Sequence, residues 1–337
     1  MVDEFINELF EQSLGAKKPK YSSSDFRIAG IVGAPVLPSE YYIEDTFPVK
    51  MQFSRGSCTA QAYTHHKERD EKIPLAAEFA MVKTKEFEGN TRYGAYTSNQ
   101  FSVGRKTGTC KEELLPEPDG IMSWEDYISI ARINEAMLGD ALNHKLKSYW
   151  FVDNSVIKST LFTYKKSVVI SMAWYRVFNK PNTGMLTTIL KGYVGGHAVD
   201  VIGWNDIVVC DDGSSGAYRV KNSWGNGWGD DGYFWLPYTL TKKVIWGGNC
   251  SLDIPRDLPV DKRYGIKRTW TSFLYEQWTA FSNTWLRGKI GRLPSNREIS
   301  GIVYGKWDYE SVFLGRCGEI WLSNSKPEAR EKKLINY

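Results

Sequence analysis

The sequence predicts an α+β protein built from two lobes, one helical and one an antiparallel β-barrel-like sheet. Stretches with helical character dominate residues 57–164, whereas residues 167–237 contain short runs of β-branched and aromatic side chains separated by glycines. Helices and strands that are segregated along the chain in this way are typical of the α+β class. We expect a cleft where the two lobes meet, and extra segments before and after the lobes.

Composition places the chain among globular proteins with a substantial core. It has 337 residues, of which 42% are hydrophobic and 24% are charged, and its 43 basic side chains stand against 39 acidic ones. A net charge of +4 is too small to indicate a nucleic-acid partner for the whole chain. The basic surplus lies at the end, because residues 261–337 contain 14 Lys and Arg but only 8 Asp and Glu.

Neither a membrane segment nor a cysteine framework is evident. No apolar run reaches the roughly 18 residues of a membrane helix, and the first residues lack the basic start and apolar centre of a secretory signal. The five cysteines are odd in number and lack C-x-x-C spacing, which argues against a disulfide scaffold or a zinc site. We therefore expect an intracellular (cytoplasmic) protein or one that is carried in a particle.

Three sections are expected along the chain. Residues 1–46 form an N-terminal helix, a linker and an extended lead-in, residues 47–260 form the main domain, and residues 261–337 form a basic, tryptophan-rich extension. The first section carries an apolar stripe at helical spacing, which we expect to pack against the main domain. A plug in the cleft and a contact with a protein partner are the alternatives. The stripe consists of Phe5, Ile6, Leu9, Phe10 and Leu14.

The main domain begins with helices. The first is expected over residues 57–72, and Pro74 ends it or opens the next, which runs to Phe87. Residues 89–118 are rich in Gly, Ser, Thr and Asn, so they indicate long surface loops with one short helix.

A second group of helices precedes the strands. Ser123 and Asp126 resemble a capping box, which predicts a helix that runs to about Lys147. A further helix is expected over residues 154–164. The expected strands are Ser167–Tyr175, His197–Trp204, Ala217–Lys221 and Gly232–Pro237.

Aromatic residues recur through the C-terminal extension. Those between residues 270 and 286 have helical spacing and predict a core-facing helix, and later strands are expected around Trp307, Phe313 and Trp321. An exposed stripe beside basic side chains that binds a larger assembly, a glycan or nucleic acid is the alternative. No nucleic-acid-binding motif supports the last of these. The helical aromatic positions are Trp270, Phe273, Trp278, Phe281 and Trp285, and the basic ones are Lys262, Arg263, Lys267 and Arg268.

Cys58 is the candidate nucleophile, because it stands at the expected start of a helix. The unpaired N–H groups and the positive dipole end of a helix favour a thiolate there. The competing interpretation is a small buried hydrophobic residue. A nucleophilic role requires a base, a group that orients the base and donors for an oxyanion.

The chain has only four histidines among which to find that base. His65 and His66 lie about two turns along the same helix, too far to reach the thiol, so a solvated or rim position is expected for both. His144 lies among lysines near a helix end and is expected at the surface. His197 begins an apolar strand directly after two glycines that allow another backbone to come close, and it is the candidate base.

Further residues complete the candidate site. The amide oxygen of Asn222 can hold one imidazole nitrogen of His197, and the indole of Trp224 can shield that contact from water. Gln52, six residues before Cys58, can donate an amide N–H to an oxyanion together with the backbone N–H of Cys58.

In order and in local wording, these residues resemble the papain-like cysteine peptidases. The chain has GSC at residues 56–58, GGHAV at residues 195–199 and KNSWGNGWGDDGY at residues 221–233, and the last of these is long and specific. The resemblance covers roughly residues 47–240 and implies a papain-like two-lobe fold. Two runs, GSCTAQA and GYFWLPY, are similar to the disulfide-free bacterial-type branch of the family. In this chain, Arg55 stands where many secreted relatives have a disulfide cysteine, and Thr59 stands where they have a tryptophan.

The resemblance implies a cysteine-type endopeptidase. Cys58 would attack a peptide carbonyl as a thiolate paired with His197, while Asn222 would orient His197 and Trp224 would cover their contact. Gln52 and the Cys58 N–H would form the oxyanion hole. The implied partner is a polypeptide substrate lying near Gly196, Ala198 and the loops of residues 89–108, and relatives use no metal or organic cofactor.

Two other functions are compatible with the same residues. The first is a catalytically idle papain-like scaffold or binding module within a larger assembly, such as a viral or phage particle, bound through residues 1–46 or 261–337. The second is a transpeptidase, in which an amine instead of water intercepts the thioester.

Overall fold

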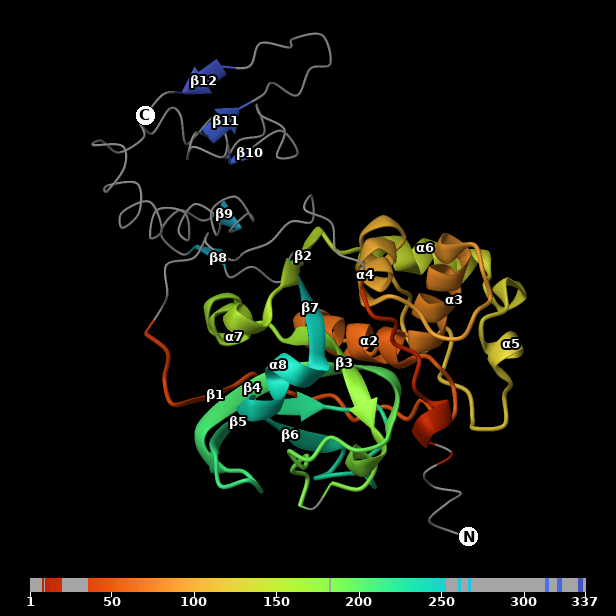
Figure 1. Ribbon diagram of the computed structural model, residues 1–337. Helices are drawn as coiled ribbons and strands as arrows, with labels where there is room; N and C mark the ends of the chain where they lie inside the picture. The colour runs from red at the N-terminus through yellow and green to blue at the C-terminus, as the bar shows by residue number, and fades with distance from the viewer. Residues whose placement is uncertain are drawn as a thin grey trace. The chain divides into compact units, whose positions relative to one another are not determined.

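The computed structural model of the chain describes residues 8, 10–19, 36–181 and 183–252, and the backbone of five short strands beyond residue 259. Contacts divide the chain into two units, Met1–Ile254 and Pro255–Tyr337. The first unit contains the helices and the main sheet. Figure 1 shows the helices before residue 145 mostly on one side of that unit and the sheet, with the later helices, on the other. Among the described residues, no helix is both long and apolar enough to cross a membrane.

The helical lobe surrounds one central helix, α2 (Cys58–Glu71). Every residue of α2 from Cys58 to Arg69 is buried, because α3 (Ala77–Glu88), α4 (Thr97–Lys106) and the sheet all pack against it. A helix that is covered on all sides needs no polar face. This explains why its sequence shows no clear amphipathic stripe.

Both ends of α2 agree with the sequence prediction for residues 57–72. The helix begins at Cys58 and ends where Lys72 adopts a left-handed conformation, with φ of 58°. The Lys72 N–H then donates to the carbonyl oxygen of Glu68 at 2.7 Å, which closes the last turn. Pro74 follows two residues later, where a helix cannot continue.

The prediction of surface loops over residues 89–118 was wrong in part. The one short helix expected there is α4, which has ten residues and buries Phe101 and Val103 against the lobe. Its polar residues are used inside the lobe, since Gln100 and Thr84 share a hydrogen bond of 2.9 Å. Polar composition indicates a loop only when the polar groups reach water.

The long helix expected from Ser123 to Lys147 is broken into short pieces. Ser123 does cap a helix, because its Oγ accepts from the Asp126 N–H at 3.1 Å. The chain then turns, and Asn134 caps a second helix by accepting from the Met137 N–H at 3.0 Å. The pieces are α5 (Trp124–Tyr127), η1 (Ile130–Arg132), α6 (Glu135–Ala141) and η2 (Leu142–His144).

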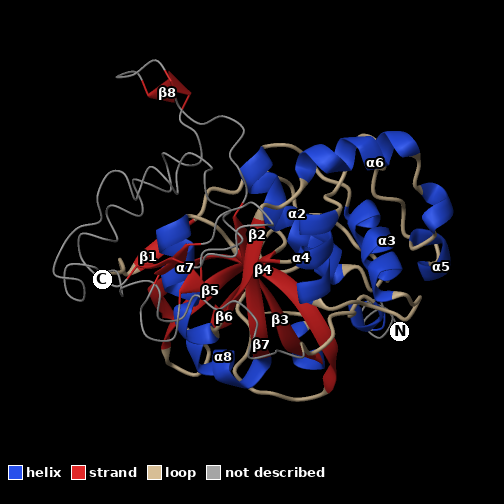
Figure 2. Ribbon diagram, turned by 90° about the horizontal axis from the view of Figure 1, so that it is seen from above, coloured by secondary structure: helices blue, strands red, loops and turns tan. Residues whose placement is uncertain are grey.

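Seven strands of the described residues form one antiparallel sheet. Along the sheet the order is β2-β7-β3-β4-β5-β6, and β1 pairs with β4 away from this path. Figure 2 shows the strands fanning out beside the helical lobe. The strands are β1 (Glu40–Tyr42), β2 (Ser148–Val152), β3 (Val168–Tyr175), β4 (Tyr193–Val209), β5 (Ser215–Lys221), β6 (Tyr233–Pro237) and β7 (Ile245–Leu252).

The expected strands correspond to β3, β4, β5 and β6, which confirms the antiparallel half of the fold. Residues 154–164 also form helix as expected, as η3 (Asn154–Val156) and α7 (Ile157–Tyr164). The sequence did not reveal β1, β2, β7 or the helix α8 (Tyr238–Val244). Two glycines and polar residues interrupt β7, so its run lacks the continuous apolar character of a buried strand.

Two large hydrophobic clusters hold the first unit together. One lies within the sheet lobe and includes Trp174, Trp204 and Phe234. The other lies between α2 and the sheet and includes Cys58 and Ala198. The second cluster places the start of α2 directly against β4.

The described strands of the C-terminal unit form two small antiparallel sheets. Phe313 pairs with Trp321, so both lie in strands as expected, whereas the expected helix over residues 270–286, the strand around Trp307 and the basic side chains lie outside the described residues. The strands are β8 (Val260–Asp261), β9 (Ile266–Lys267), β10 (Phe313–Leu314), β11 (Ile320–Leu322) and β12 (Lys333–Ile335).

Three histidines expected near the surface are buried instead. His66 lies between the hydroxyl groups of Ser167 and Ser251, at 2.9 and 2.8 Å from its two ring nitrogens. His65 is equally buried beside it on α2, and His144 is buried in contact with the Glu71 carboxylate. For His65 and His66 the prediction failed because packing of the sheet on α2 covers the face that a lone helix would expose. His144, in η2, is buried where it meets the last residue of α2.

Burial of His65 and His66 lowers the free energy of unfolding of the chain in acid. Burial, followed by nearby cationic side chains, holds the pKa of each imidazole well below its ordinary value of 6.5. Both therefore stay neutral in the folded chain, while the unfolded chain takes up protons below about pH 6.5. The free energy of unfolding must fall as the pH decreases through this range.

Replacing His66 with glutamine should weaken this pH dependence. Glutamine can keep hydrogen bonds to Ser167 and Ser251 but takes up no proton, so about 2 kcal/mol of the loss between pH 7 and pH 5 should disappear. Urea unfolding of the parent and of His66→Gln at both pH values measures the difference. Equal losses in the two proteins would contradict a neutral, buried His66.

Candidate active site

Cys58 is the first residue of α2 and has no exposed surface. Ser57 precedes the helix, and the chain before it turns at Gly56, so the sulfur faces the sheet. The backbone N–H groups of Ala198, Gly15, Thr59 and Ala16 lie near the sulfur and act to lower the pKa of the thiol. The helix start that the sequence predicted for Cys58 is therefore confirmed.

His197 and Asn222 lie in contact on the sheet side. His197 is in β4, Asn222 follows β5, and the His197 Nε2 and the Asn222 Oδ1 are 2.7 Å apart. Both residues are completely buried. With Nε2 engaged by Asn222, the other ring nitrogen, Nδ1, has no hydrogen-bond partner among the described residues.

Two tryptophans enclose the imidazole. The ring of Trp224 stacks on His197 with centroids 4.9 Å apart, in agreement with the cover expected from the sequence. Trp174, in β3, meets the imidazole edge-on at the same separation. Sequence reasoning missed Trp174, because it lies in a strand of apolar residues that gave no sign of which one would face His197.

Gln52 presents its amide to a carbonyl oxygen. Its Nε2 donates to the carbonyl oxygen of Arg55 at 2.7 Å and to that of Ser13 at 2.8 Å. Ser223 fixes the amide by donating its hydroxyl to Oε1. Ser223 is a part of the KNSWG motif whose contact the sequence did not reveal.

The carbonyl of Ser13 belongs to the cleft segment, residues 10–17, which crosses the site. The Ala16 N–H donates to the Gly196 carbonyl oxygen at 3.0 Å, and the Lys17 N–H donates to that of Ala95 at 3.0 Å. The Ala95 N–H donates in turn to the Gly15 carbonyl oxygen at 3.0 Å. The cleft segment is thus hydrogen-bonded to both lobes.

Glycines allow the cleft segment to come this close. A Cβ atom added at Gly196 would lie 2.0 Å from the carbonyl oxygen of Ala16, and one added at Gly94 would lie 1.8 Å from that of Gly15. A Cβ atom on Gly15 itself would lie 2.4 Å from the Gly56 oxygen. The glycine before His197 therefore admits another backbone, as the sequence predicted.

Side chains hold the beginning of the cleft segment. Phe10 stacks on Trp224 with ring centroids 4.5 Å apart, and Glu11 pairs with Arg176 at 2.6 Å. Leu14 is buried in the hydrophobic cluster of the sheet lobe. Of the predicted apolar stripe, Phe10 and Leu14 pack within the chain as expected, while Phe5, Ile6 and Leu9 lie outside the described residues.

The covered site holds an uncharged sulfur and imidazole. Burial raises the pKa of the Cys58 thiol to about 11, against the effect of the nearby backbone N–H groups. Burial also lowers the pKa of His197 to about 4, against its bond to Asn222. Burial therefore outweighs the helix start at Cys58 and disfavours the thiolate in this arrangement.

Arg55 has a structural task beside the site. Its guanidinium donates to the carbonyl oxygens of Pro118 and Asp119 at 2.9 and 2.5 Å, and it pairs with Glu117 at 3.2 Å. These contacts tie the chain before Cys58 to a remote loop. The four cysteines within the described residues, at positions 58, 110, 210 and 250, are all free.

Comparisons with known proteins place this geometry in a family. The family described as papain family cysteine protease matches residues 44–252, which is more than half of the chain. Cathepsin B-like CP3 of Giardia intestinalis is 50% identical over 144 residues, covering 42% of this chain and 46% of that protein. A gut-specific cysteine proteinase of Caenorhabditis elegans is 37% identical over 128 residues, covering 38% and 35%. The chain thus spans less than half the length of these curated relatives.

Solved structures share the fold. Xylellain, a cysteine protease from Xylella fastidiosa, superimposes with a TM-score of 0.60 at 23% identity, covering 72% of this chain and 96% of that one. ProCathepsin B S9 from Trypanosoma congolense gives a TM-score of 0.56 at 16% identity, covering 74% and 89%. At such identities the likeness concerns the fold, which confirms the two-lobe α+β prediction. With the family match spanning both lobes, the chain belongs to the papain family of cysteine proteases.

Proposed function

We propose that the chain is a cysteine-type endopeptidase whose cleft is closed by its own N-terminal segment. Peptide hydrolysis requires a nucleophile, a proton carrier and oxyanion donors within one site. Cys58, His197 and Gln52 supply these three parts, and Asn222 holds His197 from behind. The proposal concerns the open cleft, in which the cleft segment has moved away.

In the open cleft, the proton of the Cys58 thiol passes to Nδ1 of His197. The thiolate attacks the substrate carbonyl, and the backbone N–H of Cys58 with the Gln52 amide stabilises the oxyanion. The C–N bond then breaks as the imidazolium gives its proton to the leaving amine. Water adds to the thioester, which releases the acid and restores the thiol.

The main support for this proposal is the hydrogen bond that the Gln52 amide donates to a peptide carbonyl of the chain itself, that of Ser13. The Gln52 Nε2 lies 2.8 Å from the Ser13 oxygen, within the range expected for a donor that stabilises an oxyanion. The cleft segment to which Ser13 belongs also forms hydrogen bonds to both lobes, at Gly196 and at Ala95. An extended polypeptide therefore fits the groove, and Gln52 meets its carbonyl oxygen.

The cleft segment acts as an inhibitor in this proposal, because it places backbone N–H groups beside the sulfur. The backbone N–H groups of Gly15 and Ala16 lie beside the Cys58 sulfur, whereas attack requires a carbonyl carbon. The segment also removes the water that a thiolate and an imidazolium need. It therefore blocks the groove and keeps the reacting pair neutral.

An idle scaffold and a transpeptidase remain alternatives that no particular contact favours. All four side chains that the chemistry needs are present, so loss of activity has no visible cause. Transfer to an amine would use the same residues and differ only in what reaches the thioester.

Digestion of a library of unstructured peptides tests the proposed function. The full chain carrying Gly15→Val, a change that displaces the cleft segment, should cut the peptides at internal bonds. Mass spectrometry of the products gives the cleavage positions and the side-chain preference together. Intact peptides would point to the scaffold, trimming confined to peptide ends would exclude an endopeptidase, and ligated products would indicate transfer.

A further inference from the structure

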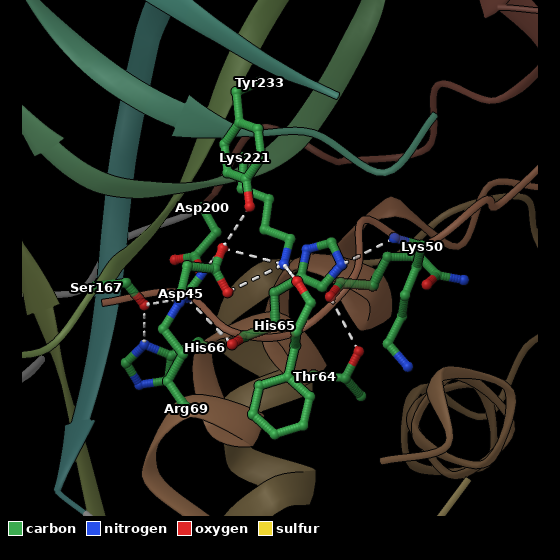
Figure 3. A network of polar contacts seen from close by, with 12 residues as sticks. Asp45, Lys50, Thr64, His65, His66, Arg69, Ser167, Asp200, Lys221 and Tyr233 are labelled. Atoms are coloured by element: carbon green, nitrogen blue, oxygen red, sulfur yellow. Dashed lines mark hydrogen bonds and ion pairs between the residues drawn. The ribbon is translucent and has the colours of Figure 1, made fainter. Parts of the chain in front are cut away.

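From a buried ionic network between the lobes, we infer that Arg69 and Asp200 are positioning residues that hold the Cys58 helix in register with the His197 strand. The inference rests on the proposed function. Neither residue touches the cleft segment or the candidate nucleophile, so neither is assigned a direct part in the chemistry. Figure 3 shows the network, which also includes Asp45, Lys221 and Tyr233.

Each element that carries or directly precedes a member of the proposed triad also carries one charge of this network. Arg69 lies on α2, the helix that begins with Cys58. Asp200 lies on β4, three residues after His197. Lys221 ends β5, directly before Asn222.

Direct contacts join these three charges. The Arg69 guanidinium pairs with Asp200 through Nη1 and with Asp45 through Nη2, the latter at 2.9 Å. Asp45 pairs in turn with the Lys221 Nζ at 3.0 Å and accepts from the Tyr233 hydroxyl at 2.9 Å. A continuous chain of ionic contacts therefore links α2, β4 and β5.

The network is almost completely withdrawn from water. The side chains of Asp200 and Lys221 are 0% exposed, and those of Arg69 and Asp45 are 5% exposed. Two cations face two anions, so the set is balanced. Buried ion pairs of this kind give little net stability, since desolvation offsets their attraction, but they penalise every arrangement that separates the charges. Their expected contribution is a fixed geometry.

The register of β4 connects this geometry to the sulfur. Ala198 and Asp200 are two residues apart in the strand, so their side chains lie on the same face of the sheet. Cys58 packs with Ala198 in one hydrophobic cluster, while Asp200 binds Arg69 further along the same helix. The helix is thereby held to the strand at two points, and the rigid fork of the guanidinium fixes the second.

The test replaces the pair without leaving a charge behind. Arg69→Met with Asp200→Leu removes one cation and one anion and keeps Asp45 paired with Lys221. In the full chain carrying Gly15→Val, kcat per reactive thiol should fall about 10- to 100-fold while KM changes less than about threefold, because misplacement of reacting groups by about 1 Å can cost two orders of magnitude. Titration with a thiol-directed epoxide counts the reactive sites.

A more exposed ion pair within the sheet lobe provides the control. Lys158 on α7 pairs with Asp206 on β4, so Lys158→Met with Asp206→Leu removes an ion pair that does not connect the lobes. Its kcat and KM should equal those of the Gly15→Val chain. The isosteric Asp200→Asn is a second test, because it keeps an acceptor for Arg69 without the charge; kcat should fall severalfold at unchanged KM.

The outcomes separate this inference from the proposed function. An unchanged kcat per titrated site in either Asp200 variant would overturn the inference and leave the peptidase in place. A loss fully explained by fewer titratable sites would also overturn it, since that indicates a structural role alone. Equal activity of Gly15→Val chains with and without Cys58 would refute the proposed function, and the inference with it.

Discussion

Replacing Cys58 with alanine is expected to lower peptide hydrolysis by the Gly15→Val chain at least about a thousandfold, to the background of the assay. Without the sulfur no thioester can form, and His197 has no nucleophile from which to take a proton. The rate is measured with an unstructured peptide and purified full-length chains. Circular dichroism of both proteins shows whether the fold is kept, which we expect because alanine is smaller than the buried thiol.

Cys210→Ala is the control for this substitution. Cys210 is also free and buried, but it lies after β4, in the turn before β5 and away from His197. Its removal should leave turnover unchanged. If instead Cys58→Ala kept its turnover, Cys58 would have no part in the mechanism.

Replacing Gly15 with valine is expected to raise hydrolysis at least about tenfold over the parent chain. Even the first side-chain atom would lie 2.4 Å from the backbone oxygen of Gly56, a contact that neither backbone can accommodate without moving. The bonds of residues 15–17 to Gly196 and Ala95 must then break. A shift of about 1.4 kcal/mol in the opening equilibrium is enough for a tenfold change in the open population.

Gly139→Val is the matched control for the opening. Gly139 lies in α6, and a Cβ atom there would meet nothing within 4 Å. Hydrolysis by this variant should equal that of the parent. An equal rate for Gly15→Val and the parent would show that the cleft segment does not restrain the site.

The parts of the fold that sequence predicted well are those in which local signals agree with packing. The strands over residues 168–175 and 215–221 have β-branched and aromatic residues between turn residues, and they occur as expected. Over residues 89–118 the expected short helix is present, but its placement at the surface was wrong because α4 buries polar residues inside the lobe. Local composition carries no information about which surface will later be covered.

In the candidate site, too, local motifs could be predicted from the sequence, whereas contacts with distant segments could not. Its residues could be found from their order, because each belongs to a short motif with a chemical reason for its residue type. The contact between His197 and Asn222 follows that expectation. The environment of the site could not be found in this way, since it depends on Trp174, on Ser223 and on the cleft segment, which precedes Cys58 in the chain.

The cleft segment illustrates why the environment of the site could not be predicted from the sequence. The apolar stripe that includes Phe10 and Leu14 indicates that some surface must cover it, but periodicity does not say which surface. Its partners are Trp224 and the sheet core, more than 130 residues away in the chain. Burial depresses the pKa of His197 and raises that of Cys58, and this burial comes from residues far apart in the chain.

Alkylation of Cys58, resolved by mass spectrometry and followed at about pH 6, tests the central claim most directly. In the Gly15→Val chain, opening returns water to the sulfur and the imidazole, so iodoacetamide should modify Cys58 far ahead of the other cysteines, as only an activated thiolate reacts readily at this pH. In the parent chain Cys58 should react no faster than they do. Slow modification of Cys58 in both chains would contradict an activated nucleophile, and rapid modification in both would contradict a closed cleft.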